Sequence, residues 1–242
     1  MPKKPKELKG SYLLLNSEKV LKTVQELAVR IRERFPESSL FLVCAELETV
    51  CSRSRERIDW IAQPIWPLRI LRYMLVAIAL IGVGFTIYAL QVDQSAGELE
   101  LTDWIQTLEA ALNEVVMLGF GILFVWGLEG RLKRRRAMRA LHELRSIAHV
   151  IDMHQLTKDP DRLDKNRPNT ESSPALLMTA FNLRRYLDYC SEMLSLVGKV
   201  AALHLQTLDD ATVVATVNEI EDLTTGLSRK IWQKIDMLRG EE

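Results

Sequence analysis

Two long apolar stretches dominate the pattern of hydrophobic and polar positions along the chain. The first covers residues 70–90 and carries one charge, Arg72, close to its beginning. As an α-helix it would extend about 30 Å, which matches the hydrocarbon thickness of a bilayer. Trp66, Tyr73 and Tyr88 lie at or near its ends, as aromatic residues do at membrane interfaces. We predict a transmembrane helix at about 70–90.

The second apolar stretch is shorter and needs residues in front of it to cross a bilayer. Residues 115–128 are uncharged but would extend only about 21 Å as a helix. Adding the preceding LEAALNE segment gives a second span at about 109–129, which returns the chain to the side where the first span began. The two spans therefore predict a transmembrane helical hairpin.

The distribution of basic residues predicts the orientation of this hairpin. No Lys or Arg occurs between Arg72 and Arg131, whereas arginines and lysines flank both spans on the other side. The short loop 91–108 carries only acidic charges. By the positive-inside rule, both termini are expected in the cytoplasm and the loop outside. We expect a multi-pass protein of the cell inner membrane.

Outside the spans, apolar residues recur at intervals of three and four, which indicates amphipathic helices. One helix is predicted over 17–35, a second over about 39–61 with Ser38 or Ser39 as its N-cap, and a continuation of the second span to about 155. A further helix is predicted over 175–205, and a last one after an N-cap at Thr207 or Asp209. No alternation typical of β-strands competes with these helices over any length.

These elements predict an all-α protein made of a two-span transmembrane helical hairpin and a cytoplasmic helical bundle built from both termini. The N-terminal helical pair takes residues 1–66, the hairpin 67–130, and the C-terminal helical region 131–242. Residues 156–174 contain three prolines and mixed charges, and we expect a polar linker there.

Composition narrows the range of functions. The 32 basic and 32 acidic residues give a formal net charge of zero, which argues against nucleic acid as a partner. The three cysteines are scattered and odd in number, so reduced thiols are expected and not a disulfide framework. The sequence contains no phosphate-binding loop, dinucleotide fingerprint, zinc-protease motif or nucleophile elbow. We therefore expect no cofactor, and an enzyme is the less favoured class.

The second span contains polar residues, and their role depends on how deeply they lie in the membrane. If the span ends inside at Leu128, Glu114 lies about 7 Å within the apolar layer, and with Asn113 it is a candidate for lining a pore in an oligomer. If the inner boundary is at Arg131, Glu114 only touches the outer headgroups. The small residues Gly84, Gly119 and Gly121 permit close helix packing.

Two further groups of residues carry possible binding chemistry. His149, Asp152 and His154 lie close in sequence, together with His142, and could hold a metal. The alternative is that they are ordinary polar positions near a helix end. The basic run after the second span sets topology and is expected to contact anionic lipid headgroups; it comprises Arg131, Lys133, Arg134, Arg135 and Arg136.

The sequence leads to one main functional hypothesis and two alternatives. The main hypothesis is a homo-oligomeric scaffold or regulatory interaction module at the cytoplasmic face of the membrane, with a cytoplasmic protein as a possible partner. The second is a homo-oligomeric cation channel or transporter lined by the second span. The third is a metal-dependent enzyme whose site lies in the cytoplasmic bundle.

Overall fold

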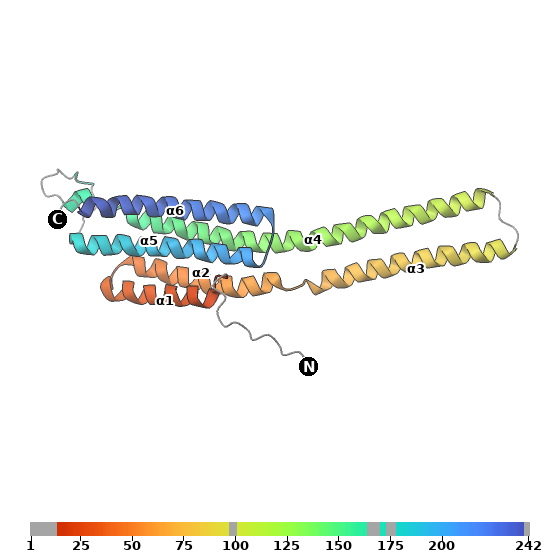
Figure 1. The fold of residues 1–242 in the computed structure, drawn as a ribbon, viewed down its shortest axis with the longest axis horizontal. Coiled ribbons are helices and arrows are strands. Elements are labelled where there is room, and N and C mark those ends of the chain that lie inside the picture. The colour runs from red at the N-terminus through yellow and green to blue at the C-terminus, as the bar shows by residue number, and fades with distance from the viewer. Residues whose placement is uncertain (1–13, 97–100, 164–169, 173–177, 240–242) are drawn as a thin grey trace, which may run out of the picture. The chain divides into compact units, whose positions relative to one another are not determined.

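All regular secondary structure in the described part of the chain is helical. The computed structural model describes residues 14–96, 101–163, 170–172 and 178–239. These residues contain six α-helices and two short 3₁₀ turns but no strand, which confirms the all-α prediction (Figure 1). The elements are α1 (Ser17–Arg34), α2 (Ser39–Ala62), α3 (Trp66–Ala96), α4 (Leu101–Leu156), η1 (Pro160–Leu163), α5 (Ala180–Leu203), η2 (His204–Gln206) and α6 (Ala211–Arg239).

The chain divides into two compact units. One unit, called here the bundle, comprises residues 1–62 and 136–242, and the other, called here the long-helix pair, comprises residues 63–135. Helix α4 contributes residues to both and is continuous over its 56 residues, as the unbroken apolar periodicity predicts.

Helices α1 and α2 of the bundle form an antiparallel pair. Asn16 caps α1, because its side-chain oxygen accepts hydrogen bonds from the backbone N–H groups of Glu18 and Lys19. Across the pair, Arg55 on α2 binds the carboxylate of Glu18 near the start of α1 at 2.6 Å. The buried faces follow the predicted stripes, from Val20 to Ile31 on α1 and from Leu40 to Ile58 on α2.

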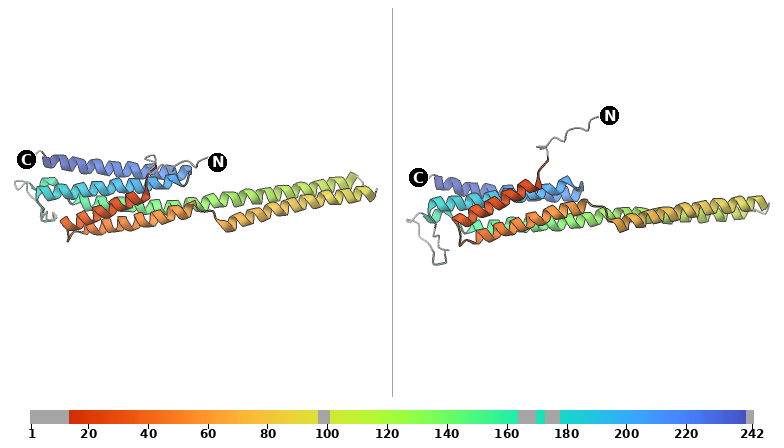
Figure 2. Two further views of the ribbon diagram at one scale, coloured as in Figure 1. Left: turned by 60° about the horizontal axis from the view of Figure 1, so that its bottom comes forward. Right: turned by 90° about the horizontal axis from the view of Figure 1, so that it is seen from below.

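Helices α5 and α6 lie beside the end of α4 (Figure 2), and the buried side chains of these three helices complete one continuous apolar core. The end of α4 lies beside α2, where Arg57 binds Glu143 at 2.8 Å, and beside α6, where Arg145 binds Glu219 at 3.4 Å. Burial of the apolar face therefore stabilises each helix, as expected for helices whose isolated stability in water is marginal. The largest fully buried side chains include Leu27, Ile31, Leu40, Leu47, Ile61, Leu141, Leu144, Ile151, Leu183, Leu187, Met193 and Leu194.

Lys234 on α6 secures the C-terminal end of α4. Its ammonium group donates to the backbone carbonyls of Gln155 and Lys158, at 2.9 and 3.2 Å, and to the side-chain oxygen of Gln155 at 2.8 Å. A cation at this place adds hydrogen bonds to carbonyls at and just beyond the end of the helix, and it complements the helix dipole. Burial lowers the pKa of Lys234, and nearby Asp159 and Asp152 oppose that shift.

Two predicted helix starts are wrong by a few residues. Helix α5 begins at Ala180, because the Thr179 hydroxyl accepts a hydrogen bond from the backbone N–H of Asn182 and caps the helix there; residues 175–177 of the predicted helix lie outside the described residues. Helix α6 begins at Ala211, and its first N–H groups bind the carboxylate of Asp210 in place of the predicted caps Thr207 and Asp209. Ser38 caps α2 as predicted, accepting from the backbone N–H of Leu40.

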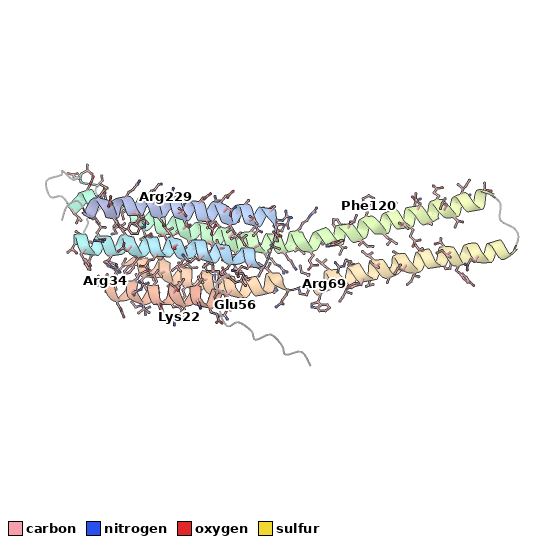
Figure 3. All side chains as sticks on the ribbon, in the orientation of Figure 1. Lys22, Arg34, Glu56, Arg69, Phe120 and Arg229 are labelled. Carbon is pink, nitrogen blue, oxygen red and sulfur yellow. The ribbon has the colours of Figure 1, made fainter. Side chains whose placement is uncertain are left out.

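The long-helix pair exposes most of its apolar side chains. Helices α3 and α4 are each long and apolar enough to cross a membrane. None of the most apolar window of α3 is buried within the structure, and only 6% of that of α4 is. Figure 3 shows the side chains along both helices, with Phe120 labelled on α4. The apolar stretches of α3 and of the first half of α4 are therefore not buried within this structure, in contrast to the second half of α4, which belongs to the core of the bundle.

Candidate functional site

One close contact within the long-helix pair joins Glu114 on α4 to Gly82 on α3. A Cβ atom built on Gly82 would overlap with a carboxylate oxygen of Glu114. The carboxylate therefore occupies the place of the side chain that glycine lacks. One turn further along α3, the Thr86 hydroxyl donates to the backbone carbonyls of Gly82 and Val83, at 2.8 and 3.0 Å. Glu114 is half-buried in this position.

A second contact shows that α3 and the first half of α4 run antiparallel. A Cβ atom on Gly121 of α4 would lie 3.9 Å from Leu75 of α3, seven residues before Gly82. Gly121, like Glu114, thus faces α3, and the two positions share a helix face because they are seven residues apart. Gly84 and Gly119 have no atom within 4 Å of an added Cβ, so neither is at a close contact within the pair.

Asn113 points out of the long-helix pair. Its side chain is exposed, whereas the neighbouring Glu114 is half-buried against α3. Exposed apolar side chains surround it along α4, among them Leu112 at 63% and Met117 at 75% exposure. The structure thus separates the two polar candidates of the second span, which lie on different faces of one helix.

The basic residues at the end of the apolar part of α4 differ in their exposure and in their contacts. Within the long-helix pair, Lys133 binds Glu129 at 3.2 Å, and both side chains are largely covered. Arg131 and Arg135 are exposed. Arg136, the first α4 residue of the bundle, stacks on the indole of Trp60 with 3.4 Å between its guanidinium carbon and the ring centre. Arg131 and Arg135 are therefore the members of the run most available to anionic groups.

The candidate metal residues lie near the end of α4 but are engaged separately. His149 is exposed, and the Asp152 carboxylate accepts a hydrogen bond from Gln155 at 2.6 Å. The ring of His154 bonds to the backbone carbonyl of Val150 and to the hydroxyl of Ser39. Among the residues that the structure describes, no group of three or more His, Cys, Asp or Glu side chains is arranged to hold a metal ion.

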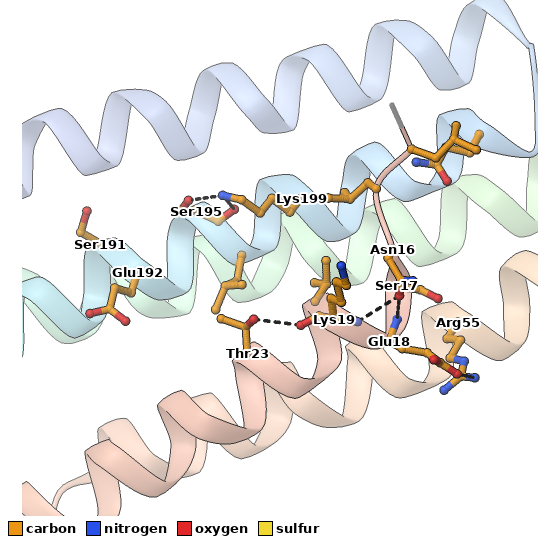
Figure 4. A pocket seen from close by; sticks show the side chains of 15 residues that line it. Asn16, Ser17, Glu18, Lys19, Thr23, Arg55, Ser191, Glu192, Ser195 and Lys199 are labelled. Carbon is orange, nitrogen blue, oxygen red and sulfur yellow. Dashed lines mark hydrogen bonds and ion pairs between the residues drawn. The ribbon is translucent and has the colours of Figure 1, made fainter. Parts of the chain in front are cut away.

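A groove on the bundle surface lies between the start of α1 and the middle of α5 (Figure 4). It has a volume of about 1070 Å³. Its lining combines Leu14, Leu15, Val20 and Leu196 with the charged residues Glu18, Lys19, Arg55, Glu192 and Lys199. The charges engage one another or nearby hydroxyls: Arg55 binds Glu18, and Lys199 binds the hydroxyl of Ser195 at 2.6 Å. Such a mixed, shallow lining fits a protein segment better than a small molecule.

Titratable groups buried in the bundle are kept neutral. Burial raises the pKa of the Cys44 and Cys190 thiols to about 12 and that of Cys51 to about 11. Burial, with the nearby charge of Arg57, lowers the pKa of His204 to about 4. Thiols that remain protonated are poor nucleophiles, so these cysteines do not form a reactive centre.

Sequence reasoning found Glu114 but missed its partner Gly82 and the groove. A glycine in an apolar span carries no sign of which side chain on another helix fills its space. The groove arises where helices from opposite ends of the chain meet, and its residues form no motif. No family model, curated protein or solved structure matches the chain.

Proposed function

We propose that this protein is an integral membrane protein whose α3 and first half of α4 form a transmembrane hairpin. The bundle would then be a homo-oligomeric scaffold or regulatory interaction module at the cytoplasmic face. The observation that carries this proposal is the contrast between the two units. The bundle encloses its own apolar core, whereas the long-helix pair leaves large side chains such as Phe85 and Phe120 about 70% exposed. Exposed apolar surface of this extent requires lipid or another protein.

The contacts between α3 and α4 provide a common depth scale for the proposed spans. Gly82 lies 12 residues after Ile70 and 8 residues before Leu90, the ends of the first span. At 1.5 Å per residue, Gly82 is about 18 Å from the inner end and about 12 Å from the outer end. Glu114 is level with Gly82, which supports placing it inside the apolar layer and not at the outer headgroups.

The bundle offers surfaces for binding and little that could perform catalysis. The thiols are buried, and the ring of His154 is held by hydrogen bonds to Val150 and Ser39. In contrast, the groove between α1 and α5 combines apolar and charged residues, and α4 exposes Val150, Met153 and Leu156 on the bundle surface. These surfaces favour protein–protein interaction over a metal-dependent reaction.

The oligomeric state of the full chain tests this proposal. The protein would be extracted with a mild detergent and its mass, after subtraction of bound detergent, measured by light scattering. We expect two or more protomers and extraction from membranes only when detergent is present. A monomer would contradict the homo-oligomeric scaffold, and release by alkaline carbonate without detergent would contradict membrane insertion.

A cation channel lined by the second span remains the second proposal, favoured by one observation. Asn113 and Glu114 are adjacent polar residues on an otherwise apolar stretch of α4, and polar residues within the apolar layer often mark ion paths. Cation flux into liposomes that contain the purified protein, lost on Glu114→Gln, would support this function. Absence of flux above that of empty liposomes would contradict it.

A further inference from the structure

A distinct face of α4, next to the one that contacts α3, has the pattern of a helix–helix seam. Asn113, Met117, Phe120 and Phe124 are spaced by four, three and four residues, which places them on one side of a helix. All four are exposed, and the three apolar members have 75%, 70% and 63% of their surfaces accessible. We call these four residues the outer seam.

The outer seam is separate from the face that α4 uses within the long-helix pair. The inner seam consists of Glu114, Leu118, Gly121 and Val125, and each of these follows a member of the outer seam by one residue. The inner residues are half-buried or, for Val125, 7% exposed. Because successive residues are rotated by about 100°, the outer seam points well away from α3.

Asn113 is the member of the outer seam whose side chain needs a hydrogen-bond partner within the membrane. On α4 between Ala110 and Leu128, it is the one exposed side chain that carries an amide, hydroxyl or charge. An amide left without hydrogen bonds in hydrocarbon is costly, and lipid tails offer no donor or acceptor. Its carboxamide has both a donor and an acceptor, so two copies of Asn113 can bond to each other. In a parallel helix pair, identical residues meet at the same level.

We propose that the outer seam binds the outer seam of a second copy of this chain, with the two Asn113 side chains hydrogen-bonded to each other. A central Asn in an otherwise apolar seam fixes register and favours a parallel pair. This inference rests on the proposed membrane insertion and specifies which face forms the homo-oligomer. It also leaves Glu114 and Gly121 to the contact with α3, so they do not form the subunit interface.

Disulfide cross-linking of the full chain in membranes tests the seam. In a background with the three native cysteines replaced by alanine, Met117→Cys and Phe120→Cys should form cross-linked dimers on mild oxidation. Val115→Cys is the matched control, because Val115 is also exposed, at 54%, but lies on the opposite side of α4. Cross-linking at residue 115 in preference to 117 and 120 would overturn the proposed face.

Substitution of Asn113 tests the hydrogen bond itself. Asn113→Leu should weaken dimerisation by roughly tenfold, measured by energy transfer between labelled copies in vesicles, whereas Asn113→Gln should retain most of it. Equal dimerisation of the parent and Asn113→Leu would overturn the role of Asn113. Membrane insertion is measured separately by flotation of the chain with vesicles. A chain that does not float contradicts the proposed function. An inserted oligomer that cross-links through residue 115 and not through 117 and 120 contradicts only the outer seam.

Discussion

The carboxylate of Glu114 occupies the space that any side chain at residue 82 would need. The polar side chain of Glu114 on α4 fits in this place only because Gly82 on α3 has no side chain. This contact also shows that residue 82 of α3 is level with residue 114 of α4. An acidic residue in this segment thus has a specific structural role, whatever its further function.

Gly82→Ala should give the full chain in mild detergent a lower thermal unfolding midpoint than Gly84→Ala gives, because the new methyl group at residue 82 displaces the Glu114 carboxylate. In a Glu114→Ala background the same change should cost nothing further. The resulting coupling energy is expected at about 0.5–3 kcal/mol, the range for residues in contact. Gly84→Ala is the control, since a Cβ there meets no atom within 4 Å. Equal effects of Gly82→Ala in both backgrounds would contradict the contact.

Gly198 permits close packing of α5 on α6. A Cβ on Gly198 would lie 3.3 Å from the Thr224 hydroxyl oxygen, closer than a relaxed contact. Gly198→Ala should destabilise the chain by about 1 kcal/mol, because an overpacking cost of about 1–3 kcal/mol exceeds the gain of about 0.5–1 kcal/mol in helix propensity. Gly226→Ala, on α6 in open space, should instead stabilise by about 0.5–1 kcal/mol because alanine favours helix. Thermal unfolding of both variants checks the opposite signs, and two shifts in the same direction would contradict this packing.

The three cysteines should be unreactive in the folded protein. Burial raises the pKa of each thiol, to between about 11 and about 12, so the thiolate is scarce at pH 8 and reagents cannot reach the sulfur. With Ellman's reagent, we expect no rapid reaction without denaturant and three thiols per chain after unfolding. A thiol that reacts within seconds in the folded protein would show that its part of the bundle is open.

His204 should make stability depend on pH in the acid range. Its folded pKa, about 4, lies below the ordinary value of 6.5, so the unfolded chain binds the extra proton between these values. The contribution to stability is complete above pH 6.5 and is lost as the pH falls toward 4, by about 3 kcal/mol in total. His204→Leu should flatten this part of the profile, measured as unfolding midpoint against pH. His149→Gln, at an exposed position, is the control and should keep the parent's profile.

Much of the fold can be predicted from the periodicity of apolar residues, because a helix that buries one face has apolar residues at intervals of three and four positions. The stripe from Val20 to Ile31 is buried as predicted, and α4 continues without a break as its apolar positions indicate. Helix starts follow less directly from the sequence, since several neighbouring residues have side chains that can cap a helix. Asp210 caps α6, although Thr207 and Asp209 are equally suitable by residue type.

The candidate site was less predictable, because it depends on which helices meet. Asn113 and Glu114 are adjacent in sequence, yet one is exposed and the other packs on Gly82. That difference is set by the direction of α3, which the sequence of α4 does not encode. The histidines near the end of α4 are close along the chain, but hydrogen bonds to Val150 and Ser39 hold His154 apart from a shared site.

The most direct test of the account is the topology of the chain in intact cells. Single cysteines would be placed at Ser95, near the end of α3, and at Ser172, which is exposed between α4 and α5, with the native cysteines replaced. An impermeant thiol reagent added outside should label Ser95→Cys in whole cells and Ser172→Cys only after the membrane is opened. Labelling of Ser172→Cys in intact cells, or protection of Ser95→Cys, would contradict a membrane hairpin with a cytoplasmic bundle.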